Sequence, residues 1–357
     1  MIYYFSLFSL FFLFAKFSNI PNTNKKKLWL ISLSFLILIL GSRYYIGGDY
    51  FGYMNLYNKM ENIESYVALI FQIEILYYSI IYICNKIGIS YFFVNFLLAF
   101  ILIFFFQRYA KNFNNPFFVL LISIPILFIP VSINFVRQGI AISIFLFSIQ
   151  YLISGRYFKY FFLIIIAAMF HKFSIIYLLF YLVYEKNFVR LYKYILFLIS
   201  CISGLLLVFF FVDIPLLSVW VNKIIWSLKT YTDNDYPVIP KGGVFRHLLI
   251  CMSFFILIYF RNFFKQYNEY KLWWSIGLIG IVLIPITYLY PFLASRIILF
   301  LLPISIFVFG HIIDMAKYKK IININILSLF YFLYFLTWIN LSPFKDFFTP
   351  YKSILFL

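Results

Sequence analysis

Apolar side chains occupy whole stretches of this sequence, without a regular alternation between apolar and polar positions. Residues 101–106, for example, read Ile-Leu-Ile-Phe-Phe-Phe, so every face of that stretch is apolar. A β-barrel needs short strands in which apolar and polar side chains alternate, whereas a helix satisfies its own backbone and can be apolar all round. The pattern therefore predicts an all-α fold, a polytopic transmembrane helical bundle.

The apolar stretches also set the expected number of helices. Those at residues 1–17, 28–40 and 91–106 are shorter than the ~20 residues that cross a bilayer, but neighbouring Tyr, Trp and Ser extend each one. We expect about twelve helices in a single integral membrane domain, residues 1–357, with both ends of the chain outside. No basic residue precedes the first stretch and no small-residue cleavage site follows it, which favours a retained helix over a signal peptide.

Composition supports the membrane class. The chain is 65% hydrophobic, 25% aromatic and only 11% charged, whereas soluble domains carry roughly 25% charged residues. The formal net charge of +18 would suggest a nucleic-acid partner in a soluble protein. In a membrane protein the same excess reflects the Lys and Arg of cytoplasmic loops. We therefore expect the lipid bilayer as a partner and no nucleic acid.

The basic clusters define a topology once residues 25–27 are placed inside. The later clusters then all fall inside if the segment near residues 66–90 is re-entrant, starting and ending on the outer side. Glu74 and the polar residues behind it support a hairpin or a broken helix there. If the segment were one span, the clusters from Arg108 to Arg156 would change sides and violate the charge rule. We therefore predict the hairpin.

Isolated charges fall on the outer side of this arrangement. Arg43 and Asp49 flank Gly47 and Gly48, a pair that allows a sharp turn and close approach to a ligand. The alternative is a salt bridge between the two charges that closes a loop. His171 lies between two short apolar stretches. An ionisable group at membrane depth is costly, which favours a function for it over a structural role.

Four arginines share the outer side. Arg137 and Ala141 lie one helical turn apart, so a small side chain leaves room beside a guanidinium suited to phosphate. The alternative is that Arg137 reaches toward lipid head groups. Arg296 follows a small-residue pair, and Arg246 lies where a long loop re-enters the membrane. Together with Arg43 they form a group suited to pyrophosphate or another polyanion.

The longest non-apolar connection, residues 213–247, is predicted to be an extracytoplasmic loop, and loops of that length usually have a function. It contains Asp233-Asn234-Asp235, which resembles the metal site of nucleotide-sugar transferases but falls on the side where such donors are scarce. The three cysteines lack metal-ligand or disulfide spacing. Motifs of phosphate-loop proteins, zinc proteases and serine hydrolases are absent. We expect no metal, no cofactor and no disulfide.

Several motifs occur in a recognisable order. They are Arg43 with Gly47-Gly48-Asp49-Tyr50 and Tyr53, Glu74, Arg137-Gln138-Gly139-Ile140-Ala141, Phe170-His171, Arg296 and Pro350-Tyr351-Lys352. This set resembles the EpsG-like family of Wzy-type polysaccharide polymerases, from about residue 40 to 352. The chain departs from the family pattern at Gly48, where Gly-Thr-Asp is the commoner form, and after Glu74, where a Pro-Gly pair is missing.

The resemblance implies a multi-pass glycosyltransferase of the bacterial cytoplasmic (inner) membrane that joins polyprenyl-pyrophosphate-linked oligosaccharide repeat units on the outer face. The product would be O antigen of lipopolysaccharide, capsule or exopolysaccharide. A chain-length regulator and a flippase of the same pathway would be partners. A pyrophosphate leaving group is already activated, so the protein has to neutralise its charge and place an acceptor hydroxyl near a base.

Residue roles follow from this hypothesis. Pyrophosphate binding is assigned to Arg137 and Arg296, supported by Arg43 or Arg246. Removal of the proton from the acceptor hydroxyl is assigned to His171, Asp49 or Glu74. Stacking on sugars is assigned to the external aromatic residues Trp220, Trp226, Tyr231 and Tyr236.

Two other enzyme or carrier classes stay open. A flippase or carrier for lipid-linked oligosaccharide would also suit an arginine-lined outward cavity, but such carriers usually show an internal repeat of half-bundles, and none is seen. A membrane O-acyltransferase acting on surface polysaccharide could use a lone His. It would take its acyl donor from the cytoplasm, whereas His171 is predicted to lie outward.

Overall fold

Helices form the regular secondary structure of the part of the chain that the computed structural model describes. That part comprises residues 2–16, 22–61, 74–184, 241–289, 291–315, 323–342 and 345–356. Within these ranges an isolated antiparallel bridge joins Arg43 to Ser353 without forming a strand. The predicted all-α fold is confirmed.

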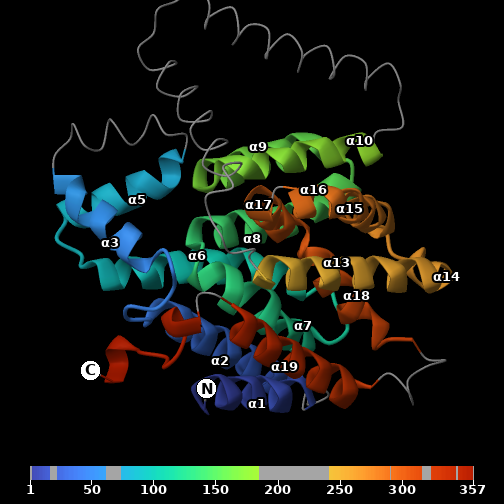
Figure 1. The fold of residues 1–357 in the computed structure, drawn as a ribbon, viewed down its shortest axis with the longest axis horizontal. Coiled ribbons are helices and arrows are strands. Elements are labelled where there is room, and N and C mark those ends of the chain that lie inside the picture. The colour runs from blue at the N-terminus through green and yellow to red at the C-terminus, as the bar shows by residue number, and fades with distance from the viewer. Residues whose placement is uncertain are drawn as a thin grey trace, which may run out of the picture.

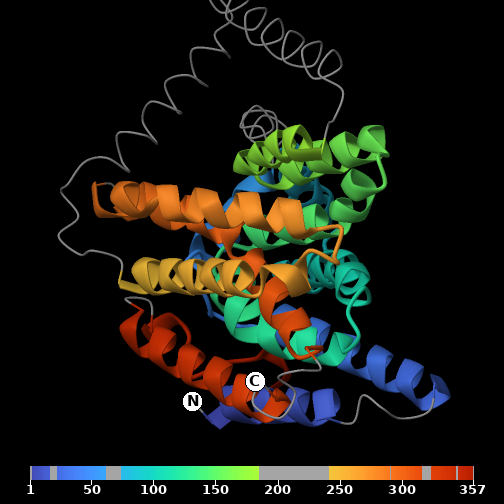
Figure 2. The same cartoon turned by 90° about the vertical axis from the view of Figure 1, so that its right-hand side faces the viewer.

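The helices follow one another with short connections where the chain is described. In chain order they are α1 (Ile2–Lys16), α2 (Asn22–Gly41), α3 (Tyr50–Asn58), η1 (Lys59–Glu61), α5 (Ile75–Lys86), α6 (Tyr91–Ala110), α7 (Pro116–Ser123), η2 (Ile124–Ile133), α8 (Val136–Ile153), α9 (Tyr157–Phe170), η3 (Lys172–Phe180), α10 (Tyr181–Tyr184), α13 (Lys241–Tyr259), α14 (Arg261–Phe264), α15 (Tyr270–Val282), α16 (Ile284–Leu289), α17 (Pro291–Leu301), α18 (Pro303–Ile312), α19 (Ile324–Leu341), η5 (Lys345–Phe347) and η6 (Ile354–Phe356). They lie in layers, with α1 and α19 on one face and α9 on the opposite face (Figures 1 and 2).

Several helices have the length and composition of membrane spans. Among the described residues these are Tyr91–Ala110, Pro116–Ile133, Val136–Ile153 and Ile324–Leu341. Shorter apolar helices such as α9 and α13 pack beside them. Large apolar side chains, Phe93 and Phe162 among them, stay exposed on the outside of the bundle. Such a surface suits lipid and not water, and the chain is a membrane protein.

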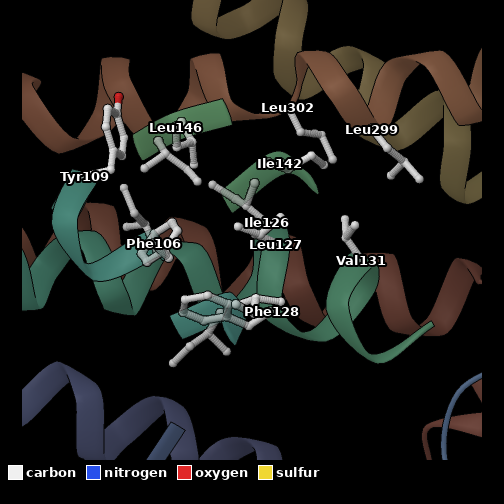
Figure 3. Close-up of a cluster of buried hydrophobic side chains, with 14 of the residues drawn as sticks. Phe106, Tyr109, Ile126, Leu127, Phe128, Val131, Ile142, Leu146, Leu299 and Leu302 are labelled. Atoms are coloured by element: carbon white, nitrogen blue, oxygen red, sulfur yellow. The ribbon is translucent and has the colours of Figure 1, made fainter. Parts of the chain in front are cut away.

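The segment formed by α7 and η2 lies at the centre of the bundle. It is apolar on all sides, and 94% of its span is buried. Pro125 and Pro130 have no backbone N–H and crowd the preceding turn, and η2 winds as a wider π-helix where they occur. Ser132 Oγ donates to the carbonyl of Leu127 at 3.2 Å. Side chains from α6, η2, α8 and α17 meet around this segment (Figure 3), including the T-shaped pair of Phe106 and Phe128.

The two ends of the bundle differ in chemistry. At one end, which we call the basic end, α2 and α9 begin and α6 ends. Arg108 packs over Phe104 and Phe147, Lys111 packs over Trp29, and Lys159 packs over Tyr151. The opposite end, which we call the site end, includes α3 and α5 (Figure 1).

Helix α5 lies entirely at the site end. It has 12 residues, or about 18 Å of helix, which is too short for a hydrocarbon core of roughly 30 Å. Glu74, before its first residue, contacts Arg137 at the start of α8. At its other end Asn85 Nδ2 donates to the carbonyl of Tyr57 at 3.1 Å, and Tyr57 hydroxyl donates to the carbonyl of Ile89. Helix α5 thus runs from the contact of Glu74 with α8 to the turn that precedes α6. The first part of the predicted hairpin, residues 66–73, lies outside the described part, and the hairpin stays a prediction.

Candidate functional site

Arg137 projects from the first turn of α8 at the site end. The helix begins at Val136, directly after the break that follows η2. The side chain is 22% exposed, and its guanidinium lies over the rings of Tyr53 and Tyr77, 5.1 and 5.3 Å from their centres. Ala141, one turn further on, is buried. Arg137 is therefore held by aromatic faces and still reaches the surface of the site.

Glu74 bridges Arg137 and His171. Its Oε2 forms an ion pair with Nη1 of Arg137, and its Oε1 lies 2.9 Å from Nδ1 of His171. The Glu74 side chain is only 6% exposed. A buried carboxylate is stable when it is paired and hydrogen-bonded on both oxygens, as here. One carboxylate thus fixes the spacing of two side chains that come from different helices.

His171 has a defined orientation. It follows the last residue of α9 in extended conformation, and its ring lies parallel to that of Phe300 at 5.7 Å. A carboxylate can only accept a hydrogen bond, so Nδ1 carries the hydrogen that faces Glu74. The neutral imidazole then has its lone pair on Nε2. The side chain is 17% exposed, so this nitrogen is suited to take a proton from a bound hydroxyl.

Tyrosine hydroxyls extend the cluster. Arg137 Nε donates to the hydroxyl of Tyr53 at 3.4 Å, and that hydroxyl lies 3.4 Å from Oδ2 of Asp49. Arg137 Nη1 lies 3.4 Å from the hydroxyl of Tyr78. Asp49 therefore joins the Arg137 cluster through Tyr53. Sequence reasoning missed Tyr77 and Tyr78; their position one turn after Glu74 was the available signal.

Arg43 lies in the scaffold of the site. It is buried, with Nη1 donating to the carbonyls of Ser132 and Ile133 at 3.2 and 2.5 Å and Nη2 donating to Oδ1 of Asn95 at 3.0 Å. Carbonyl oxygens of η2 thus engage Nη1 and Asn95 of α6 engages Nη2, while Nε has no hydrogen-bond partner among the described residues. These contacts differ from the alternative of a salt bridge with Asp49.

The glycine pair approaches protein backbone at the same junction. Gly47 has a φ of +104°, and its N–H donates to the carbonyl of Phe347 at 3.0 Å. A Cβ at Gly47 would lie 2.5 Å from the carbonyl oxygen of Ile133. The N–H of Gly48 donates to Oδ1 of Asn134 at 2.7 Å. The turn thus packs against the end of η2, two residues before α8 begins.

Arg296 lies beside the cluster, within electrostatic range of Arg246. The carbonyl of Arg296 accepts a hydrogen bond from Gln138 Nε2 at 3.1 Å, and its guanidinium lies 4.2 Å from the ring centre of Phe135. Its charge acts on both His171 and Arg246. The structure thus brings Arg137, Arg296 and His171 into one region of the site end, with Arg246 within electrostatic range of Arg296.

Other residues lie apart from the cluster. His247, the neighbour of Arg246 in sequence, is a structural residue, with Nε2 donating to the carbonyl of Gly280 at 2.6 Å and Nδ1 lying 2.9 Å from the hydroxyl of Thr287. The four aromatic residues expected to stack on sugars, Trp220, Trp226, Tyr231 and Tyr236, lie outside the described residues, as do Asp233 and Asp235. Among the residues that are described, no group of three His, Cys, Asp or Glu could hold a metal ion.

Comparison with protein families gives a match over most of the chain. A family model described as the EpsG family matches residues 26–353, nearly the whole chain and the whole of the cluster around Glu74. A search of curated proteins and a search of solved structures found no match.

Proposed function

The chain belongs to the EpsG family, a family of Wzy-like polysaccharide polymerases, and from this premise we propose that it joins polyprenyl-pyrophosphate-linked oligosaccharide repeat units on the outer face of the cytoplasmic membrane. The observation that carries the proposal is the Glu74 bridge between Arg137 and His171. It combines a base and a cation at one end of a membrane bundle, and this transfer needs both groups.

The chemistry is a displacement at the anomeric carbon of the donor sugar. The acceptor hydroxyl oxygen bonds to that carbon, the bond from the carbon to the pyrophosphate oxygen breaks, and the polyprenyl pyrophosphate leaves with the electron pair. His171 Nε2 takes the proton of the hydroxyl. Because Glu74 Oε1 already lies 2.9 Å from Nδ1, it stabilises the imidazolium that forms. Glu74 is thus a positioning residue in this proposal.

The cations neutralise the pyrophosphate. Arg137 is partly balanced by Glu74, so the charge offered to a pyrophosphate falls more heavily on Arg296, with Arg246 in support. Guanidinium groups fixed before the reaction stabilise a developing phosphate charge without reorganising. Arg43 is proposed as a positioning residue that holds the end of η2. Asp49 acts through Tyr53, which it contacts at 3.4 Å.

The substrate partners follow from the same proposal. A flippase would deliver the lipid-linked units to the site end, and a chain-length regulator would act on the growing polymer. Trp220, Trp226, Tyr231 and Tyr236 are proposed to stack on sugar rings, since aromatic faces pack well on their apolar sides. The site end would then face outward and the basic end the cytoplasm, as the charge rule for membrane loops requires.

The test is the size distribution of surface polysaccharide in cells that lack the chain and are supplied with variants at equal protein level. Arg137→Ala or Arg296→Ala should leave single repeat units, with lipid-linked units accumulating outside. Arg261→Ala, an exposed arginine at the basic end, is the matched control and should keep the full ladder.

Other results would contradict the proposal. Lipid-linked units trapped inside would support a flippase. A ladder of normal length that lacks acyl groups would support an O-acyltransferase. An unaltered ladder would remove the substituted arginine from the site.

A further inference from the structure

A cavity lies at the basic end of the bundle, opposite the end that holds Glu74. It has a volume of about 770 Å³. Its lining comes from the turn between α8 and α9, the end of α10 and the turn before α15. Ligand sites typically measure roughly 300–1,000 Å³, so this cavity is large enough for a small molecule or a head group.

The wall of the cavity is positive. Lys265 and Lys271 line it, and none of the described residues that line it is acidic. Two helices also begin in this wall, α9 at Tyr157 and α15 at Tyr270. The amino end of a helix carries a partial positive charge, and both helices exceed three turns. Two ammonium groups and two helix ends thus act on the same space.

Among the described residues, the carboxyl group of Glu269 lies between two lining residues in sequence and is engaged by other side chains. Glu269 accepts hydrogen bonds from Trp273 Nε1 at 2.9 Å and from the hydroxyl of Tyr109 at 3.3 Å, both beneath the wall. Burial raises the pKa of Glu269 to about 7, so a part of the population is uncharged at neutral pH. The negative charge of Glu269 therefore offsets the positive charge of the two lysines only in part.

The wall is held in place by contacts across the elements. The hydroxyl of Tyr184 donates to the carbonyl of Asn268 at 2.9 Å and ties α10 to the turn before α15. Tyr267 stacks on His311 with ring centres 3.9 Å apart. Because these contacts already order the wall, its side chains lose little conformational entropy when a ligand binds.

We propose that this cavity binds a phosphate-bearing anion, either the head group of an anionic phospholipid or a soluble phosphate ester. Lysine is a common phosphate ligand because its ammonium is a compact charge with three donors. The other basic residues at this end, such as Lys26 and Lys27, are exposed on α2 and line none of the described cavities. The combination of cavity, lysines and helix ends distinguishes this place from general basic surface.

The test compares two double variants of the purified full chain in detergent, with phospholipid retention measured by native mass spectrometry. Lys265→Ala/Lys271→Ala removes the cavity charges. Lys26→Ala/Lys27→Ala removes the same charge from the same end, outside the cavity. The probes are phosphatidylglycerol, phosphatidylcholine and inorganic pyrophosphate. Elution volume and thermal unfolding check that both variants are folded.

We expect only the cavity variant to lose phosphatidylglycerol binding. The cavity variant should retain phosphatidylglycerol about tenfold less than wild type, and the α2 variant within about twofold of it. If pyrophosphate instead binds wild type and the α2 variant but not the cavity variant, the ligand is a soluble phosphate ester. Equal losses in both variants, or no loss in either, would overturn the proposal, because the lysines would then act only through general surface charge.

Discussion

At the scale of single residues, the site depends on one carboxylate that serves two partners. Glu74 pairs with Arg137 through one oxygen and with His171 through the other. Removing one member of such a buried group leaves the others with an unbalanced charge or an unmet hydrogen bond. The arrangement thus explains why a glutamate is needed here, although in our proposal Glu74 touches neither reacting atom.

Glu74→Gln tests this role. The amide oxygen can still accept from His171, but the neutral side chain no longer balances Arg137 or a protonated imidazole. We expect polymer-forming turnover to fall about 10²-fold or more, measured with purified protein and lipid-linked repeat units. Glu269→Gln, at the opposite end, is the control and should stay within about twofold of wild type. Turnover near the wild-type value in Glu74→Gln would contradict the role.

The tyrosines around Arg137 offer a matched pair. The Tyr53 hydroxyl contacts both Arg137 and Asp49, whereas the buried Tyr77 hydroxyl has no partner among the described residues, although its ring packs on Arg137. Tyr53→Phe should therefore lower turnover about tenfold, the effect of one lost hydrogen bond. Tyr77→Phe should leave turnover unchanged. Equal effects of the two changes would show that only the rings matter.

At the scale of elements, the direction of Arg137 is set by the junction between η2 and α8. Arg43 holds the last carbonyls of η2, and Asn134 accepts from Gly48 within the break itself. The site residue is thus mounted on a segment whose geometry depends on a turn about 90 residues earlier. The short C-terminal segment contributes through the carbonyl of Phe347, which accepts from Gly47.

The Gly47 turn gives a second matched pair. Gly47→Ala would place a Cβ 2.5 Å from the carbonyl oxygen of Ile133 at a φ of +104°. We expect this change to lower the free energy of unfolding by about 2 kcal/mol or more. Gly52→Ala, in α3 with open space around it, should be neutral or stabilising by about 0.5 kcal/mol. Thermal unfolding in detergent measures both, and equal melting temperatures would contradict this account of the turn.

The sequence predicted the class of fold better than the partners of each side chain. Helix formation and the two differing ends depend on local apolar length and on charge, which can be read along the chain. The environment of Arg43 depends instead on which carbonyls η2 leaves near it, and no local pattern shows this. Glu74 could be named as a candidate base, but its link to both Arg137 and His171 requires α5, α8 and α9 to meet.

At the scale of the whole molecule, the two ends carry separate chemistry. The site end holds the Glu74 cluster, and the basic end holds the lysine-lined cavity with Glu269 beneath it. The helices between them are closely packed around α7 and η2. Because the two groups lie at opposite ends of the bundle, a substitution at the basic end removes no contact of the Glu74 cluster.

Glu269 makes stability depend on pH in a defined direction. Burial raises its pKa from 4.5 to about 7, so the folded state favours the protonated form. The fold loses stability as pH rises from about 4.5 to 7, because only the unfolded chain ionises freely there. Glu269→Gln should remove this loss and be more stable than wild type at pH 8 by on the order of 1–3 kcal/mol. Parallel melting-temperature curves of the two proteins from pH 5 to 8 would contradict this.

Turnover and binding of lipid-linked repeat units by purified His171→Gln in liposomes test whether His171 is the base. Gln can still hydrogen-bond to Glu74 but cannot take a proton, so we expect binding within about threefold of wild type and polymer formation reduced at least about 10²-fold. Polymer formation near the wild-type rate would show that His171 is not the base.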